Sequence, residues 1–162
     1  MIFLQTADCR PPTADCQPWT DLPSSARHVP KFCCPEHHKF EAGSLYKLWI
    51  LASVYEKIDD KTLNPNEILT QDVATLNEKF QIATENAELK DGEITLSIKS
   101  ALFQMITISH NYAALLLTDK IKLSSLKAFL AKEGFLESKI GTEDGIPITT
   151  ASDMALFLEK LP

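Results

Sequence analysis

Apolar residues at helical spacing between residues 44 and 58 are the feature that most constrains this fold. Ala42 and Gly43 interrupt the pattern just before this stretch. After them, apolar side chains recur at the spacing of one helix face, at Leu45, Leu48, Trp49, Ala52 and Tyr55. This spacing is typical of a helix that packs against a core. We therefore predict a buried helix that begins near Ser44.

Two polar residues share a face at the start of this predicted helix. Ser44 and Lys47 are three positions apart, which places their side chains about 5–6 Å from each other on a helix. An amine at that distance can take a proton from a hydroxyl group. The free N–H groups of the first turn favour an oxyanion, and the helix dipole disfavours a charged lysine nearby. The pair therefore indicates an activated serine nucleophile.

The same four residues also have a structural interpretation. Ser-x-x-Lys is a short pattern, and it occurs a second time in this chain, from Ser124 to Lys127. A serine at the start of a helix commonly caps the helix with its side chain. The tetrad alone is therefore consistent with either a nucleophile or a cap at Ser44.

The composition is that of one globular domain. The chain has 162 residues, of which 44% are hydrophobic, and this length allows a single core. A net charge of −6 argues against a nucleic-acid partner. No apolar run is long enough to span a bilayer. We expect a monomer without a cofactor.

The first 39 residues differ from the rest. Six of the nine prolines lie there, at Pro11, Pro12, Pro18, Pro23, Pro30 and Pro35. Proline fixes φ and removes a backbone donor, so we predict a poorly ordered arm over residues 1–39, apart from a short strand at residues 2–5. The globular domain is predicted over residues 40–162. The segment Met1–Thr6 lacks the basic flank of a secretion signal, which predicts a cytoplasmic chain unless an export signal is missing; the localisation stays open.

All cysteines lie in this arm, at Cys9, Cys16, Cys33 and Cys34, and two histidines follow, at His37 and His38. Their spacing matches no zinc-ligand pattern, and adjacent cysteines rarely bind one ion. We therefore predict no metal site and interpret the cysteines as reduced or incidental thiols.

The remaining patterns predict a mainly α fold with no strong strand pair. A short extended piece is predicted at residues 67–70. Helices are predicted at residues 72–87, from Ile94 to about residue 108, at residues 112–117, at residues 122–132 before Gly134, and after a capping box at residues 150–153. Thr95 or Ser97 is available as the cap of the second of these.

Three adjacent polar residues, Ser109, His110 and Asn111, separate two apolar helical runs. One interpretation is a polar corner in which Asn111 caps the following helix. The other is functional, because three hydrogen-bonding side chains in the middle of a core usually have partners to bind.

Three segments resemble, in the correct order, the class A β-lactamases and their penicillin-binding relatives. Residues 41–48 are similar to the Ser-x-x-Lys helix of that family, and residues 101–117 are similar to its Ser-Asp-Asn segment with the flanking helices. Residues 148–155 resemble the threonine-capped helix that follows the family's active-site loop. The resemblance covers residues 40–161. It implies the helical part of an α+β fold, with most of the antiparallel sheet missing.

The resemblance also implies roles for four residues. Ser44 would attack the carbonyl of a β-lactam or of a D-alanyl peptide and form an acyl-enzyme, with its own N–H in the oxyanion hole. Lys47 would accept the proton, directly or through a water molecule. Ser109 would relay a proton to the leaving nitrogen, and Asn111 would hydrogen-bond the substrate amide.

The chain departs from the family pattern in several ways. His110 stands where the family has aspartate, and neither Lys-Thr-Gly nor Glu-x-x-Leu-Asn occurs in the sequence. The acids of the corresponding loop, Glu137, Glu143 and Asp144, are interpreted as solvated side chains. We therefore expect little turnover. A D-Ala-D-Ala peptidase and a non-catalytic helical binding module remain alternative hypotheses.

Overall fold

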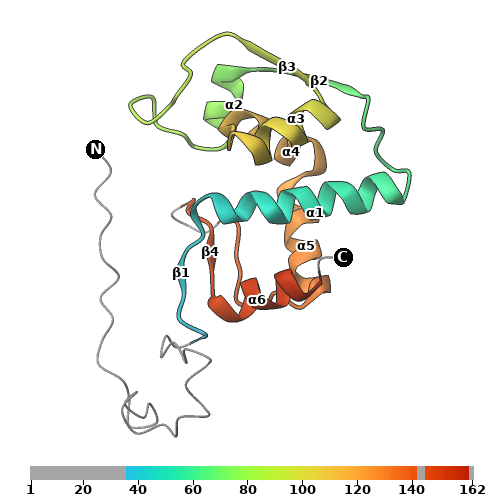
Figure 1. Cartoon of the computed structure of the whole chain (residues 1–162). Coiled ribbons are helices and arrows are strands. Elements are labelled where there is room, and N and C mark those ends of the chain that lie inside the picture. The colour runs from blue at the N-terminus through green and yellow to red at the C-terminus, as the bar shows by residue number, and fades with distance from the viewer. Residues whose placement is uncertain (1–35, 142–144, 161–162) are drawn as a thin grey trace, which may run out of the picture.

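A computed structural model describes residues 36–141 and 145–160 of the chain. The described part is mainly helical, as predicted. Helix α1 (Tyr46–Asp59) crosses the middle of the molecule (Figure 1). On one side of it lie β2 (Ile68–Asp72), α2 (Val73–Lys79), β3 (Glu93–Ser97), α3 (Ile98–Thr107) and α4 (Asn111–Ile121). On the other side lie β1 (Phe40–Glu41), α5 (Leu123–Glu133), β4 (Ile148–Thr149) and α6 (Ala151–Glu159).

Helix α1 begins two residues later than predicted, and it is buried over more of its circumference than the single predicted face. A 3₁₀ turn, Gly43–Leu45, precedes it. The most buried apolar side chains of α1 are Trp49, Ile50 and Val54, whereas Tyr55 is 52% exposed. The prediction that Tyr55 belongs to the buried face was wrong. The reason is that α1 contacts α3 and α4 on one side and α5 on the other, so no single stripe faces the core.

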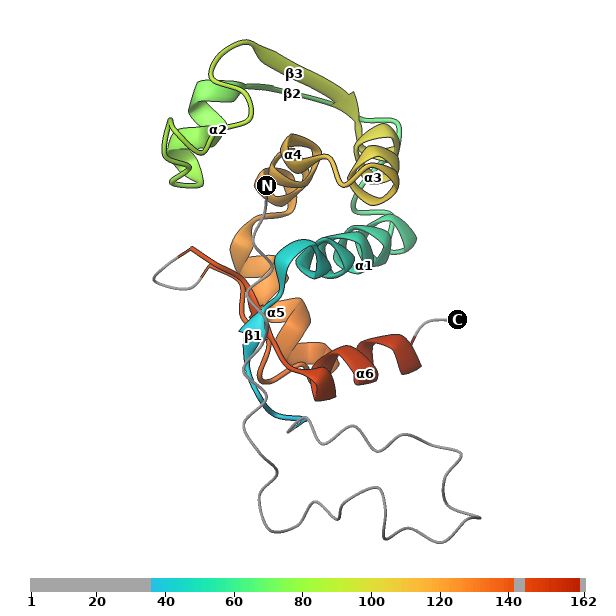
Figure 2. The ribbon, with the colours of Figure 1, turned by 60° about the vertical axis from the view of Figure 1, so that its left-hand side comes forward.

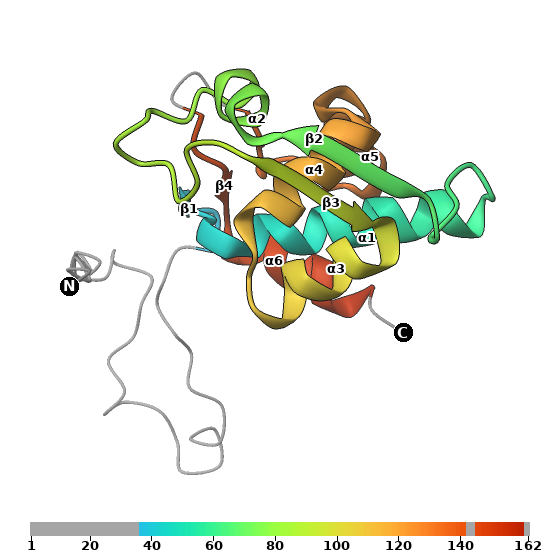
Figure 3. The same ribbon diagram turned by 90° about the horizontal axis from the view of Figure 1, so that it is seen from above.

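A strand pair was not predicted, and the structure contains one. Strands β2 and β3 pair antiparallel, with Ile68 opposite Ser97 and Asp72 opposite Glu93. They lie side by side over α4 (Figure 2 and Figure 3). The apolar residues Ile94 and Leu96 therefore belong to β3 and not to the following helix. Helix α3 begins after Ser97, whose Oγ accepts the Ser100 N–H at 3.1 Å, as one of the two predicted caps.

The helix predicted over residues 72–87 is shorter in the structure. Helix α2 ends at Lys79, and residues 80–92 form a loop that leads to β3. The Asp72 carboxylate caps this helix by accepting the Thr75 N–H at 2.8 Å. The apolar spacing beyond Lys79 was too weak to identify this end, and the loop becomes important at the functional site.

A second strand pair holds the segment that leads into α1. Strand β1 pairs antiparallel with β4, and the Ala42 N–H donates to the Pro147 carbonyl at 2.8 Å. The threonine cap predicted for the last helix is confirmed, because Thr150 Oγ1 accepts the Asp153 N–H at 3.2 Å. The other half of the predicted capping box differs, because the Asp153 carboxylate accepts the Ser138 N–H at 2.6 Å. The Glu36 carbonyl accepts the Ser152 N–H at 2.9 Å, so residues near the predicted boundary at Lys39 contact α6.

The strand expected at residues 2–5 and the four cysteines lie outside the described residues, so the arm remains a prediction. Among the helices that the structure describes, none is long and apolar enough to cross a membrane.

Lys122 joins α4 to α5 in an unfavourable backbone conformation. Its φ is 72° and its ψ is 142°, a region in which side chains other than that of glycine are strained. Its ammonium group lies 3.5 Å from Asp119, but the side chain is 63% exposed, so this ion pair contributes little stability.

We therefore predict that Lys122→Gly raises the free energy of unfolding by about 1 kcal/mol, because glycine adopts this conformation without strain. Urea denaturation followed by circular dichroism measures the change. The matched control is Lys127→Gly, at an exposed position inside α5, which we expect to lower stability by about 1 kcal/mol. A loss of stability in both variants would contradict the assignment of strain to Lys122.

Candidate active site

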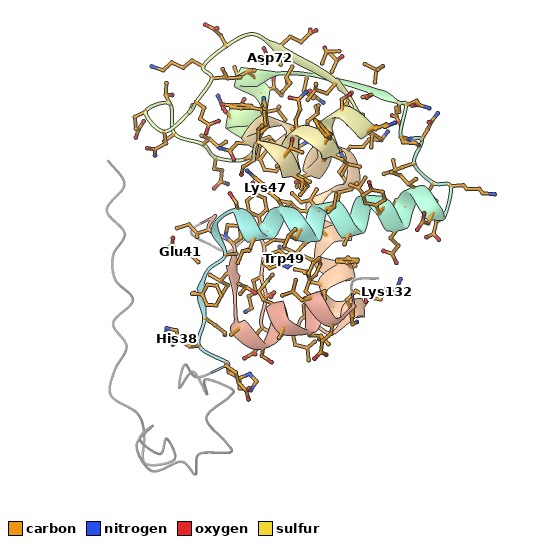
Figure 4. All side chains as sticks on the ribbon, viewed as in Figure 1. His38, Glu41, Lys47, Trp49, Asp72 and Lys132 are labelled. Carbon is orange, nitrogen blue, oxygen red and sulfur yellow. The ribbon has the colours of Figure 1, made fainter. Side chains whose placement is uncertain are left out.

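The four residues predicted to form a site come together at the start of α1. Ser44 lies in the 3₁₀ turn that precedes the helix, and Lys47 lies in its first turn. Ser109 belongs to the segment between α3 and α4, and Asn111 is the first residue of α4. Figure 4 labels Lys47 on the side of α1 that faces these two helices.

Lys47 is the buried centre of this cluster. Its side chain is only 2% exposed. Its Nζ donates to the Ser109 carbonyl at 2.6 Å, to Ser109 Oγ at 2.8 Å and to Asn111 Oδ1 at 2.6 Å. Three acceptors match the three protons of an ammonium group. Burial lowers the pKa of Lys47, because the charged form loses its hydration, while the negative charge of Glu88 acts in the opposite direction.

Ser44 hydrogen-bonds to Ser109 and does not cap the helix. Its Oγ lies 3.0 Å from Ser109 Oγ. Neither the 3₁₀ turn nor α1 has a capping hydrogen bond from a side chain, so the capping interpretation of Ser44 was wrong. The Ser109 hydroxyl therefore lies between the Ser44 hydroxyl and the Lys47 amine, within hydrogen-bond distance of both.

The backbone at Ser109 is also unusual. Its φ is 56°, in the left-handed region that few residues other than glycine adopt. This conformation lets both the carbonyl and the hydroxyl of Ser109 face the Lys47 ammonium group. A strained residue with such contacts is typical of a functional site, where neighbouring groups hold it in place.

The helix cap of α4 is His110, and the prediction that Asn111 caps this helix was wrong. The His110 Nδ1 accepts the Ala113 N–H at 3.2 Å. Asn111 is one residue further on, where its side chain is available to Lys47. The His110 imidazole thus accepts a hydrogen bond within its own helix turn, at the position where the family that the sequence resembles has an aspartate.

Glu88 is a site residue that the sequence analysis missed. Its Oε1 accepts a hydrogen bond from Asn111 Nδ2 at 2.5 Å. The residue lies in the loop after α2, close to the end of the helix that was predicted over residues 72–87. Nothing in the sequence distinguishes it from the nearby Glu85, because only the folded loop brings it to Asn111.

An open pocket lies beside these residues. Its volume is about 270 Å³. It is lined by Glu88, Leu89, Ile108, Ser109, His110, Asn111 and Tyr112. Polar groups of the site therefore line a concave surface large enough for part of a small molecule.

The comparisons with known proteins decide the family. A model of the β-lactamase enzyme family matches residues 24–162, which is most of the chain. The chain belongs to this family. The resemblance to serine β-lactamases seen in the sequence is thereby confirmed.

A solved structure shows the same fold as this β-lactamase family member. A β-lactamase from Sphaerobacter thermophilus superposes with a TM-score of 0.60 at 22% sequence identity. The alignment covers 76% of the present chain and 48% of that protein, so the chain spans about half of its length. No curated protein sequence matches the chain significantly.

Glu137, the described acid of the loop after α5, has partners outside the Ser44 cluster in this family member. The Glu137 Oε2 lies 2.7 Å from His37 Nδ1 and accepts from Thr150 Oγ1 at 3.3 Å. The hydrogen bond to His37 lowers the pKa of Glu137 and raises that of His37. Glu143 and Asp144 lie outside the described residues. Within residues 36–141 and 145–160, no group of three or more His, Cys, Asp or Glu side chains could hold a metal ion.

We predict that His110→Ala lowers the free energy of unfolding by about 1 kcal/mol, because the Ala113 N–H loses its acceptor. Asparagine is a good cap, so His110→Asn should retain the wild-type stability. Thermal and urea denaturation of the two variants measure the difference. Equal stability of the alanine and asparagine variants would contradict a capping role for His110.

Proposed function

We propose that this chain is a serine hydrolase that acts on β-lactam rings through an acyl-enzyme at Ser44. One observation carries the proposal: the Ser109 Oγ lies 3.0 Å from the Ser44 Oγ and 2.8 Å from the Lys47 Nζ. These distances form a continuous proton path from a surface hydroxyl to a buried amine. Membership of the β-lactamase family supports the reaction type.

The proton path suggests the order of the acylation step. The Ser109 hydroxyl gives its proton to neutral Lys47 and takes the proton of Ser44, whose oxygen attacks the lactam carbonyl. When the ring opens, the proton returns from Lys47 through Ser109 to the leaving nitrogen. Burial supports this role, because it lowers the pKa of Lys47 and so increases the fraction of neutral amine.

Two further groups are assigned to the substrate. The Ser44 N–H lies at the start of the 3₁₀ turn, where backbone donors lack partners within the helix, and it would stabilise the oxyanion. Asn111 lines the open pocket and would hydrogen-bond the amide beside the lactam ring. The exposed side chains of Ser44, Ser109 and Asn111 are accessible to such a ligand, unlike that of Lys47.

A D-alanyl-D-alanine peptide is the second candidate substrate. The observation that favours it is the absence of Glu-x-x-Leu-Asn from the sequence. Class A β-lactamases use the glutamate of this motif for deacylation. Without such a carboxylate, a β-lactam acyl-enzyme should persist. Hydrolysis of a D-alanyl-D-alanine peptide faster than of a cephalosporin would favour the peptidase.

We predict that a fluorescent penicillin labels the chain covalently and that Ser44→Ala abolishes the label, because the acylated oxygen is lost. Intact-mass spectrometry and gel fluorescence measure the label. The matched control is Ser124→Ala, which removes the serine of the second Ser-x-x-Lys pattern and should leave labelling unchanged. Labelling that survives Ser44→Ala would exclude Ser44 as the nucleophile. Reversible binding without a covalent label would favour the non-catalytic module.

We also predict that the rate of labelling rises with pH through the lowered pKa of Lys47, because only the neutral amine accepts a proton. Arginine remains charged at all accessible pH values. Lys47→Arg should therefore slow labelling by about 10²-fold or more and flatten its pH profile. Penicillin labelling that is quenched after fixed times between pH 5 and 10 measures both effects. A wild-type rate that falls as the pH rises would contradict the base role of Lys47.

A further inference from the structure

The Asn111 amide lies between a carboxylate and a buried ammonium group. Its Nδ2 donates to Glu88 Oε1 at 2.5 Å, and its Oδ1 accepts from Lys47 Nζ at 2.6 Å. Each end of the amide is therefore bonded to the group of matching polarity. The loop between α2 and β3 thus contributes a charge to a site whose other members come from α1 and from the segment between α3 and α4.

This arrangement fixes the orientation of the amide. A flipped Asn111 would place its NH₂ group against the Lys47 ammonium group and its oxygen against the Glu88 carboxylate. Both contacts would be repulsive. Lys47 alone would favour the orientation in which Asn111 Oδ1 accepts its proton. Glu88 adds a strong charge-assisted hydrogen bond to Asn111 Nδ2, at the other end of the amide. The second proton of Nδ2 is left available for a ligand.

The Glu88 side chain is exposed, so its position depends on the backbone next to it. The Tyr112 hydroxyl lies 2.7 Å from the Leu89 carbonyl and accepts the Leu89 N–H at 3.2 Å. Asn77 Nδ2 donates to the same carbonyl at 2.9 Å, and the Tyr112 hydroxyl lies 2.9 Å from Asn77 Oδ1.

The side chains of Tyr112 and Asn77, which together form a clamp on Leu89, belong to the core of the molecule. Tyr112 is 2% exposed and Asn77 is 9% exposed, and Tyr112 packs with Val73 and Leu76 of α2. A buried tyrosine and asparagine that bond both polar groups of one exposed residue are a specific way of fixing a loop. The residue so fixed is the neighbour of Glu88.

We propose that Glu88 is a positioning residue of the Ser44 site, which holds Asn111 in one orientation and places a negative charge across the Asn111 amide from Lys47, and that Tyr112 and Asn77 keep it there. Its part in catalysis rests on the proposed function of Ser44. Its effect on Lys47 does not, because that effect is present in the chain without substrate.

Two other titratable side chains adjoin the site residues in sequence: Tyr46 precedes Lys47, and His110 lies between Ser109 and Asn111. Burial raises the pKa of Tyr46, the residue before Lys47, so its phenol stays neutral near neutral pH. The His110 ring uses its Nδ1 to cap α4. Neutralising Glu88 should therefore change the pKa of Lys47 directly. In a chain without the Glu88 charge, burial should be the remaining cause of the shift in that pKa.

The test is a titration of Lys47 in the full chain. In ¹³C-lysine-labelled protein, the Cε–Hε signal of Lys47 is identified by its absence in Lys47→Arg. We expect Glu88→Gln to lower the pKa of Lys47, and the rise of penicillin labelling with pH to move to lower pH with it. Glu85→Gln, in the same loop, is the matched control and should change neither. An unchanged Lys47 titration in Glu88→Gln would overturn the proposal.

A second pair of variants tests the clamp. Tyr112→Phe keeps the ring and removes the hydroxyl, and we expect it to lower the pKa of Lys47 in the wild-type chain but not in the Glu88→Gln background. The control is Tyr55→Phe, on the exposed side of α1. Equal shifts in both backgrounds would show that Tyr112 does not act through Glu88 and would overturn the clamp. Normal titration shifts with no penicillin labelling would support the positioning of Lys47 while contradicting the proposed hydrolase.

Discussion

Burial of one ammonium group constrains the rest of this structure. A charged lysine removed from water requires hydrogen-bond acceptors, and all three acceptors of Lys47 come from residues 109–111. The start of α1 must therefore contact the segment between α3 and α4, although more than 60 residues separate them in sequence. The positive φ of Ser109 follows from the same requirement, since one residue has to present both its carbonyl and its hydroxyl to the amine.

The same burial links the protonation of Lys47 to folding. Because the pKa of Lys47 is lowered in the folded chain, the folded state binds this proton more weakly than the unfolded state does. The destabilisation caused by protonated Lys47 is present in full at pH values below its lowered pKa. Between that lowered pKa and the ordinary pKa of lysine, the free energy of unfolding rises with pH. The neutral amine that the proposed chemistry needs is therefore also the form that the fold tolerates better.

Local signals in the sequence predicted local structure well. Thr150 and Ser97 cap their helices as expected, and Gly134 ends α5 in a left-handed conformation. The β2–β3 pair and the contact of Glu88 with Asn111 could not be predicted, because they depend on how distant segments pack. The family resemblance identified the four residues that meet at the site, but not the position of the Ser109 hydroxyl between Ser44 and Lys47.

The β1–β4 pair has a mechanical consequence for the nucleophile. Glu41 pairs with Ile148, the Ala42 N–H is bonded to the Pro147 carbonyl, and Ser44 follows two residues later. Ser109 belongs to the segment between α3 and α4, and these two helices lie on the opposite side of α1 from β1 and β4 (Figure 2). Any slip in the register of this short strand pair would therefore move the Ser44 hydroxyl away from the Ser109 hydroxyl. Alignment of the proposed nucleophile therefore depends on a strand pair whose residues are not members of the proton path.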